Sequence, residues 1–169
     1  MSASAPVVVV MGVSASGKST IGKALAARLG CPFEEGDDLH PKANVDKMRS
    51  GHPLNDADRA PWLDRVADWI GQQYRSGEGG VISCSALKRR YRDLLRQADP
   101  HLAFVFPDPD RETLRNRLQE RKHHFMPSSL LDSQFEALER PCRDEQVLRL
   151  SGKEPIDAAV DEICDWIGP

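Results

Sequence analysis

A motif of the form G-x-x-x-x-G-K-[ST] fills residues 12–19, and it limits the possible folds of this chain more than any other feature. It follows residues 6–11, an apolar run rich in valine that predicts a strand buried on both faces. Apolar residues at helical spacing then predict a helix from Lys18 to a stop at Gly30. A strand, a glycine-rich turn and a helix in this order are the context in which the motif binds phosphate.

Each part of this loop has a physical reason to contact a nucleoside triphosphate. Gly12 and Gly17 permit backbone angles that other residues avoid, and they let the chain approach a ligand closely. The loop N–H groups and the positive end of the helix then face the α- and β-phosphates. Lys18 is expected to reach the β- and γ-phosphates, and Ser19 to offer its hydroxyl to Mg²⁺. The candidate nucleotide-binding residues here are Gly12, Val13, Ser14, Ala15, Ser16, Gly17, Lys18, Ser19 and Thr20.

The rest of the chain alternates between strand and helix patterns. Further strands are predicted at 31–35, 80–85, 102–106 and 146–150, and further helices at 42–51, 60–74, 87–97, 111–122, 128–139 and 156–167. This alternation implies one α/β domain over residues 1–169, with a parallel sheet covered by helices on both faces. Such sheets bind ligands beyond the carboxyl ends of their strands. The loops expected to carry function are therefore 12–19, 35–42, 83–89, 107–110 and 151–155.

Charge and cysteine usage narrow the class of protein. The net charge of −3 argues against a nucleic-acid partner, because nucleic-acid-binding domains are usually basic. The longest apolar run, 7–13, is too short to span a bilayer, so no membrane partner is expected. The first six residues have no basic region of the kind that opens a signal peptide. The four cysteines form no C-x-x-C pair and are expected to be free thiols, which indicates a cytoplasmic protein.

A phosphate-binding loop indicates a nucleoside triphosphate and no more, since switch GTPases, motor ATPases and small-molecule kinases all use it. The chain has no N-K-x-D motif for reading guanine, and its size favours a kinase. A kinase also needs a site for a second substrate and a cover that excludes water from the γ-phosphate.

The acidic turn after the second predicted strand supports two interpretations. Glu35, Asp37 and Asp38 would lie near the phosphate-binding loop, where a carboxylate can accept the proton of an attacking hydroxyl. Alternatively the segment is an acidic turn in which Asp37 or Asp38 caps a helix.

Two basic features are also candidates. Cations at the start of a helix oppose its dipole, so those that open the helix at 87–97 indicate an anionic ligand, with Arg90 at least expected on the solvated surface. These cations are Lys88, Arg89, Arg90 and Arg92. Arg117 and Arg121 are spaced by four residues on one helix face. They belong either to a cover that brings guanidinium groups to phosphate oxygens or to an ordinary charged helix.

Taken together, these stretches resemble the small gluconate kinases of the phosphate-loop type, the thermoresistant gluconokinases. The matching segments are MGVSASGKST (11–20), GDDLHPKANVDKM (36–48), G-PLND-DR-PWL (51–63), SCSALKRRYRDLLR (83–96) and HFMPSSLLDSQF-LE (124 to about 139). The resemblance implies phosphorylation of D-gluconate to 6-phospho-D-gluconate with ATP and Mg²⁺. It also implies a fold like that of nucleoside monophosphate kinases, with a five-stranded parallel sheet, a helical lid at about 121–130 and usually a homodimer.

The resemblance assigns roles to particular residues. Lys18, Asp37 and Arg121 match the catalytic residues, with Asp37 accepting the proton of the sugar hydroxyl and Arg121 reaching the phosphates from the lid. Arg117 matches the arginine near adenine, and Arg59, by likeness to shikimate kinases, falls where a carboxylate is held. The other expected pocket members are His40, Arg49, Asp58 and Lys88, and the expected metal site consists of Ser19 and Glu35.

Two positions depart from the family pattern, and two rival functions remain. Glu35 stands where we expect Asp in many relatives, and His123 stands where we expect Gly. A shikimate kinase would carry G-G-G after the third strand, where this chain has SCSALK at 83–88. A nucleotide-binding module without catalysis would have no use for the base Asp37.

Overall fold

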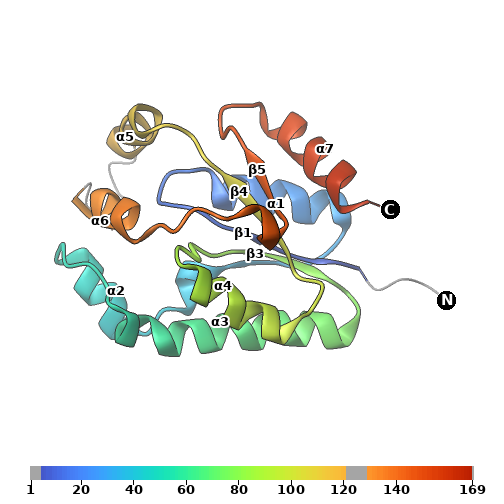
Figure 1. Ribbon diagram of the computed structural model, residues 1–169, viewed down its shortest axis with the longest axis horizontal. Coiled ribbons are helices and arrows are strands. Elements are labelled where there is room, and N and C mark those ends of the chain that lie inside the picture. The colour runs from blue at the N-terminus through green and yellow to red at the C-terminus, as the bar shows by residue number, and fades with distance from the viewer. Residues whose placement is uncertain (1–4, 121–128, 169) are drawn as a thin grey trace.

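The computed structural model of the protein describes residues 5–120 and 129–168, apart from the side chains of residues 129 and 130 (Figure 1). Most of the predicted lid at 121–130, with Arg121 and His123, lies outside this part of the chain. Five parallel strands form one sheet in the order β2-β3-β1-β4-β5. The strands are β1 (Val7–Val10), β2 (Phe33–Glu35), β3 (Gly80–Ser83), β4 (Ala103–Pro107) and β5 (Val147–Leu150). The predicted parallel sheet is confirmed.

Helices cover both faces of this sheet. The α-helices are α1 (Lys18–Leu29), α2 (Lys42–Arg49), α3 (Asp56–Ser76), α4 (Arg89–Ala98), α5 (Arg111–Glu120), α6 (Ser129–Ala137) and α7 (Ile156–Ile167). Two short 3-10 helices are η1 (Gly36–Leu39) and η2 (Arg143–Glu145). In Figure 1, α1 and α7 lie on one side of the sheet and α3 and α4 on the other, while α2, α5 and α6 gather towards the carboxyl ends of the strands.

The core explains why β1 is a continuous valine run. Successive side chains of a strand point to opposite faces of the sheet. Val8 and Val10 accordingly pack with residues of α1 and α7, whereas Val7 and Val9 pack with residues of α3 and α4. A third cluster supports the loop after β1 from the side of α5 and α6, and its buried members are Val13, Ala15, Leu87, Leu114 and Leu131. The phosphate-binding loop therefore rests on packed apolar side chains.

Helix α3 begins earlier than the predicted range of 60–74. Asn55 caps it, because the Asn55 side chain accepts a hydrogen bond from the Asp58 N–H at 2.8 Å and the Asp58 carboxylate accepts one from the Asn55 N–H at 2.9 Å. This reciprocal arrangement is a capping box. Pro61 therefore lies inside the helix rather than in its first turn. Among the described residues, no helix combines the length and the apolarity needed to cross a bilayer.

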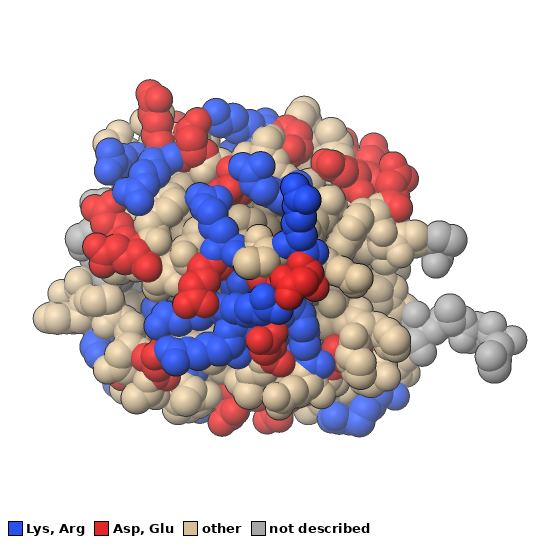
Figure 2. All heavy atoms as spheres, viewed as in Figure 1, with Lys and Arg blue, Asp and Glu red and all other residues tan. Residues whose placement is uncertain are grey.

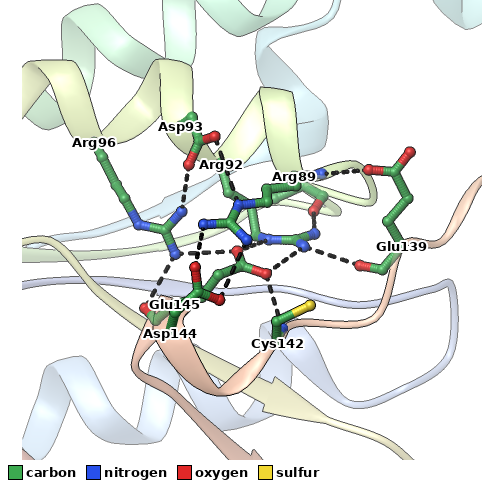
Figure 3. Close-up of polar contacts among 9 residues, drawn as sticks. Arg89, Arg92, Asp93, Arg96, Glu139, Cys142, Asp144 and Glu145 are labelled. Carbon is green, nitrogen blue, oxygen red and sulfur yellow. Dashed lines mark hydrogen bonds and ion pairs between the residues drawn. The ribbon is translucent and has the colours of Figure 1, made fainter.

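The cations at the start of α4 find their anions within the protein. Arg92 is fully buried, and its guanidinium donates to both carboxylate oxygens of Glu145, at 2.7 and 3.0 Å (Figure 3). Arg89 pairs with Asp144 at 2.7 Å, while Lys88 and Arg90 both pair with Asp56 at the start of α3. Figure 2 shows the same pattern on the surface, where Lys and Arg side chains over α4 alternate with Asp and Glu. We expected these cations to bind an anionic ligand, but in the structure they pair with carboxylates of η2 and α3.

Candidate active site

Residues 12–17 form a tight loop at the carboxyl end of β1. Gly12 and Gly17 have φ angles of 134° and 99°, which favour glycine. A Cβ at Gly12 would lie 3.0 Å from Ser16 Oγ and 3.3 Å from the Pro107 carbonyl oxygen, so a side chain there would crowd the loop. Ala15 also has a positive φ, 66°, which costs an L-residue about 1–2 kcal/mol. Sequence reasoning missed this strained alanine, because no glycine marks it.

The loop fits a phosphate group. The Ser16 hydroxyl is buried and has no hydrogen-bond partner among the described residues. Leaving such a group unsatisfied costs about 1–3 kcal/mol. A phosphate bound in this type of loop would offer an oxygen that accepts the hydrogen bond of the Ser16 hydroxyl. Lys18 begins α1, and its ammonium donates to the Val13 carbonyl oxygen at 2.9 Å, so it lies folded over the loop.

Two side chains from other elements hold the loop. The Ser14 N–H donates to Gln134 Oε1 of α6 at 2.7 Å. Arg117 of α5 donates to the Ala15 carbonyl at 3.0 Å and to the Gly152 carbonyl, between β5 and α7, at 2.7 Å. The predicted nucleotide residue Arg117 therefore joins the loop to the segment after β5. Arg121, its predicted partner, lies outside the described residues.

The predicted metal residues lie together. Glu35 ends β2, and its carboxylate accepts a hydrogen bond from the Ser19 hydroxyl at 2.5 Å and a very short one from the Ser83 hydroxyl at the end of β3. The longer side chain at position 35 thus still reaches the start of α1. Hydroxyl and carboxylate oxygens are ligands that Mg²⁺ accepts beside phosphates and water. Thr20, the last predicted loop residue, is exposed on α1.

A pocket next to Lys18 brings the predicted catalytic and substrate residues together. The pocket is lined by Lys18 itself, by Asp37 of η1, by His40 just after η1, and by Arg59 of α3. The remaining lining consists of Ser14, Met48, Leu54, Trp62, Ser85, Leu87, Ser133 and Gln134. Cation, carboxylate, imidazole and guanidinium groups therefore face one space at the carboxyl ends of the strands.

His40 is held as a neutral ring in this pocket. Its imidazole stacks on the indole of Trp62, and burial, together with the positive charge of Arg59, lowers the pKa of His40 to about 4. Tyr91 orients Arg59, because the Arg59 guanidinium donates a hydrogen bond to the Tyr91 hydroxyl at 3.2 Å. The Tyr91 hydroxyl donates to Asp56, so this aromatic residue of α4 positions Arg59. Sequence reasoning missed Tyr91, whose spacing resembles that of ordinary core residues.

Three predicted substrate residues lie outside this lining. Asp58 accepts a hydrogen bond from the Lys47 ammonium at 2.6 Å, which lowers the pKa of Asp58, and its carboxylate also completes the capping box at Asn55. Lys88 donates to Asp56 at 3.0 Å. Arg49 is exposed at the end of α2. The structure therefore gives Asp58 and Lys88 ion-pair partners within the protein and gathers Lys18, Asp37, His40 and Arg59 in the pocket.

A second cavity, of about 460 Å³, lies at the other end of the sheet. It is lined by residues before β1 and β4, together with charged side chains of α4 and η2. Those charges pair with one another, Arg89 with Asp144 and Arg96 with Glu145. Because the charged side chains of this second cavity are paired with each other, the candidate catalytic and substrate-binding groups are those of the pocket at the carboxyl ends of the strands.

The sheet order, the phosphate-binding loop and the adjoining polar pocket define a small-molecule kinase of the P-loop class. Comparison with known proteins agrees, because a protein-family model described as an AAA domain matches residues 7–142. The chain is 53% identical to a gluconokinase of Gluconobacter oxydans, over 92% of this chain and 87% of that protein. It belongs to the gluconokinase family.

Two crystal structures extend the comparison to three dimensions. A gluconokinase from Sinorhizobium meliloti has a TM-score of 0.84 and 45% identity, covering 96% of this chain and 91% of that one. An unliganded sugar kinase from Janibacter has a TM-score of 0.91 and 41% identity, covering 96% of this chain and 94% of that one. The predicted family and fold are thus confirmed.

Proposed function

We propose that this protein transfers the γ-phosphoryl group of ATP to the terminal hydroxyl of D-gluconate and releases 6-phospho-D-gluconate and ADP. The observation that carries the proposal is the single pocket lined by Lys18, Asp37, His40 and Arg59. It combines a cation for the phosphates, a carboxylate for the hydroxyl proton and a guanidinium for the substrate acid. The family relationship names the substrate.

The triphosphate of ATP would bind to residues 12–20, and the Lys18 ammonium would contact the β- and γ-phosphates. The orphan hydroxyl of Ser16 supports this placement, because a phosphate oxygen would satisfy it. Ser19 and Glu35 would hold Mg²⁺, which would neutralise charge on the phosphate oxygens.

Asp37 would act as the general base. It lines the same pocket as Lys18, so a hydroxyl held near Asp37 also lies near the phosphates. As the substrate oxygen bonds to the γ-phosphorus, the bond from that phosphorus to the β,γ-bridging oxygen breaks. The hydroxyl proton passes to the Asp37 carboxylate, and ADP carries away the leaving oxygen.

Arg59 would bind the gluconate carboxylate, and His40 a hydroxyl of the chain. Arg59 is partly buried and oriented by Tyr91, which prepares its guanidinium for a planar carboxylate. A neutral sugar would leave that guanidinium without its anion. The loss of one charge-assisted contact costs about 1.5–3 kcal/mol, or about ten- to a hundred-fold in catalytic efficiency.

We also propose roles for the lid and for the residues around the pocket. Arg121 and the lid at 121–130 would close over the phosphates, and Arg117 would lie near adenine. Asp58 and Lys88, paired with Lys47 and Asp56, would shape the substrate site indirectly, and Arg49 would border it. The resemblance supports a homodimer, testable by analytical ultracentrifugation. The free thiols of all four cysteines support a cytoplasmic location.

A substrate panel tests the proposal. The purified protein is assayed with ATP and Mg²⁺ against gluconate, glucose, shikimate and glycerate, beside Arg59→Ala. We expect gluconate to be preferred, with a preference over glucose that falls about ten- to a hundred-fold in Arg59→Ala. As a matched control, Arg65→Ala removes an arginine of α3 that bonds to the Leu39 carbonyl, and it should keep the preference. Shikimate reacting faster than gluconate would overturn the assignment.

A further inference from the structure

Asn44, a buried residue of α2, is not one of the residues that line the pocket, but its side chain contacts His40, which lines it. Its exposed fraction is 5%, and its amide nitrogen Nδ2 lies 2.8 Å from the Asp58 carbonyl oxygen and 3.2 Å from His40 Nδ1. A backbone carbonyl can only accept a hydrogen bond, so the group that faces Asp58 is the amide NH₂. The second hydrogen of that NH₂ is then available to His40.

The direction of the Asn44–His40 hydrogen bond fixes the tautomer of the ring. A neutral imidazole carries one proton, on Nδ1 or on Nε2. Because Asn44 donates to Nδ1, this atom must be the acceptor, and the ring proton must reside on Nε2. The groups that face the ring favour the neutral form, because Trp62 stacks on it and Arg59 adds a positive charge. Lys18 and Asp37 line the same pocket.

We propose that Asn44 is a positioning residue that holds His40 as the Nε2–H tautomer, so that this ring donates to a substrate oxygen in the pocket. The inference rests on the proposed function for the identity of that substrate, but not for the tautomer. Among the described residues, none forms a hydrogen bond with Nε2, and His40 lines the pocket. In this proposal, the Nε2–H group contacts an oxygen of the substrate.

This arrangement selects for oxygen acceptors on the substrate. Arg59 and His40 would both donate, and Asp37 would accept the proton of the reacting hydroxyl. A donor that is neutral does not depend on protonation of the ring near neutral pH. With the other tautomer the ring would present a lone pair, so a substrate hydroxyl would have to turn its own proton towards His40 and could not accept a hydrogen bond there.

The tautomer can be measured directly in the protein without ligand. In a sample with ¹⁵N-labelled histidine, two-dimensional NMR distinguishes protonated from unprotonated ring nitrogens. We expect His40 to show an unprotonated Nδ1 and a protonated Nε2 at neutral pH. In Asn44→Leu, which keeps the approximate size but lacks the NH₂, a mixture of the two tautomers should appear, while the signals of the exposed His52 and His101 should not change. A protonated Nδ1 in the wild type would overturn the inference.

Kinetics provide the second readout. If the two tautomers become equally populated in Asn44→Leu, about half of the molecules carry the Nε2–H ring, so KM for gluconate should rise about twofold while KM for ATP stays unchanged. His40→Gln supplies an amide donor that does not depend on Asn44. Adding Asn44→Leu to His40→Gln should therefore have no further effect on KM for gluconate. Equal effects of Asn44→Leu in both backgrounds would contradict the inference, and so would an unchanged tautomer in Asn44→Leu.

The two proposals fail in different ways. The NMR measurement needs no substrate and needs only the wild-type protein, so it decides the tautomer even if Asn44→Leu does not fold. An Nε2–H ring without turnover of gluconate would overturn the proposed substrate and leave the role of Asn44 intact.

Discussion

The imidazole of His40 lies flat against the indole of Trp62, with ring centroids 4.3 Å apart and 13° between the ring planes. Trp62 is buried, and its indole N–H donates to the Gly36 carbonyl at 2.8 Å, which holds the stacking surface in place. The folded protein therefore keeps His40 neutral, and its pKa falls from an ordinary value of 6.5 to about 4.

Replacing His40 by Gln should make folding stability less sensitive to acid. Between pH 6.5 and 4 the unfolded chain binds a proton at this residue and the folded protein does not. The stability that comes from the neutral ring is thus complete above pH 6.5 and is lost as the pH falls towards 4. Urea denaturation at several pH values should show a steeper loss in the wild type than in His40→Gln. His101→Gln, at an exposed position, should keep the wild-type slope. Identical slopes for wild type and His40→Gln would contradict this account of the ring.

Replacing Glu35 by Gln should weaken the use of Mg²⁺. The carboxylate holds the Ser19 hydroxyl at 2.5 Å, and loss of a residue that orients a metal ligand typically costs about 10–100-fold in metal affinity or activity. Titration of activity with Mg²⁺ at fixed ATP should show the increase in the half-maximal concentration. Glu34→Gln is the matched control, because neighbouring strand residues face opposite sides of the sheet. The same Mg²⁺ dependence in wild type and Glu35→Gln would exclude Glu35 from the metal site.

The buried ion pair between Arg92 and Glu145 should dominate the stability of the α4 region. Removing one partner of such a pair costs about 3–5 kcal/mol, so Arg92→Met should lower the free energy of unfolding by that amount. Asp161→Asn breaks the exposed pair with Arg28 and should have a much smaller effect, because water and salt screen exposed charges. Denaturant titration measures both. Similar small losses in the two variants would show that the Arg92 pair is energetically unimportant.

The same pair predicts a response to acid. Burial disfavours the Glu145 carboxylate, but hydrogen bonds from Arg92 and from the Cys142 N–H prevail and lower its pKa to about 2. An ordinary glutamate has a pKa of 4.5, so the stability due to this carboxylate is complete above pH 4.5 and is lost as the pH falls towards 2. Glu145→Gln should flatten the stability profile in that range.

Much of the fold follows from local sequence patterns. The valine run of β1, the phosphate-binding motif and the alternation of strands and helices each depend on neighbouring residues, and these predictions are confirmed by the parallel sheet. Each strand lies within its predicted range except β4, which ends at Pro107, one residue later. The start of α3 was predicted wrongly, because the apolar stripe begins at Trp62 while the helix is capped about two turns earlier, at Asn55.

The parts of the site that escaped prediction depend on contacts between distant residues. Arg92 lies 53 residues from Glu145, so nothing near Arg92 in the sequence indicates that its guanidinium is buried. Gln134 lies 120 residues from Ser14 in the sequence, yet its side-chain oxygen accepts a hydrogen bond from the Ser14 N–H. Lys88 and Asp58 have the residue types of a substrate site, yet each pairs with a charged residue of the protein. Only the folded arrangement distinguishes these ion pairs from ligand contacts.

The most direct test of the central claim is phosphoryl transfer to gluconate by wild type and Asp37→Asn, followed by ³¹P NMR. The amide keeps the size of the carboxylate but cannot accept a proton, and loss of a general base lowers rates by about 10²–10⁴-fold. We expect a sugar phosphate signal from gluconate and ATP with the wild type. In Asp37→Asn we expect this loss of rate while ATP binding is retained. Asp38→Asn, at the exposed neighbouring position, should stay within a few-fold of the wild type. A wild-type protein that consumes ATP with shikimate or glucose but forms no phosphate ester of gluconate would contradict the account.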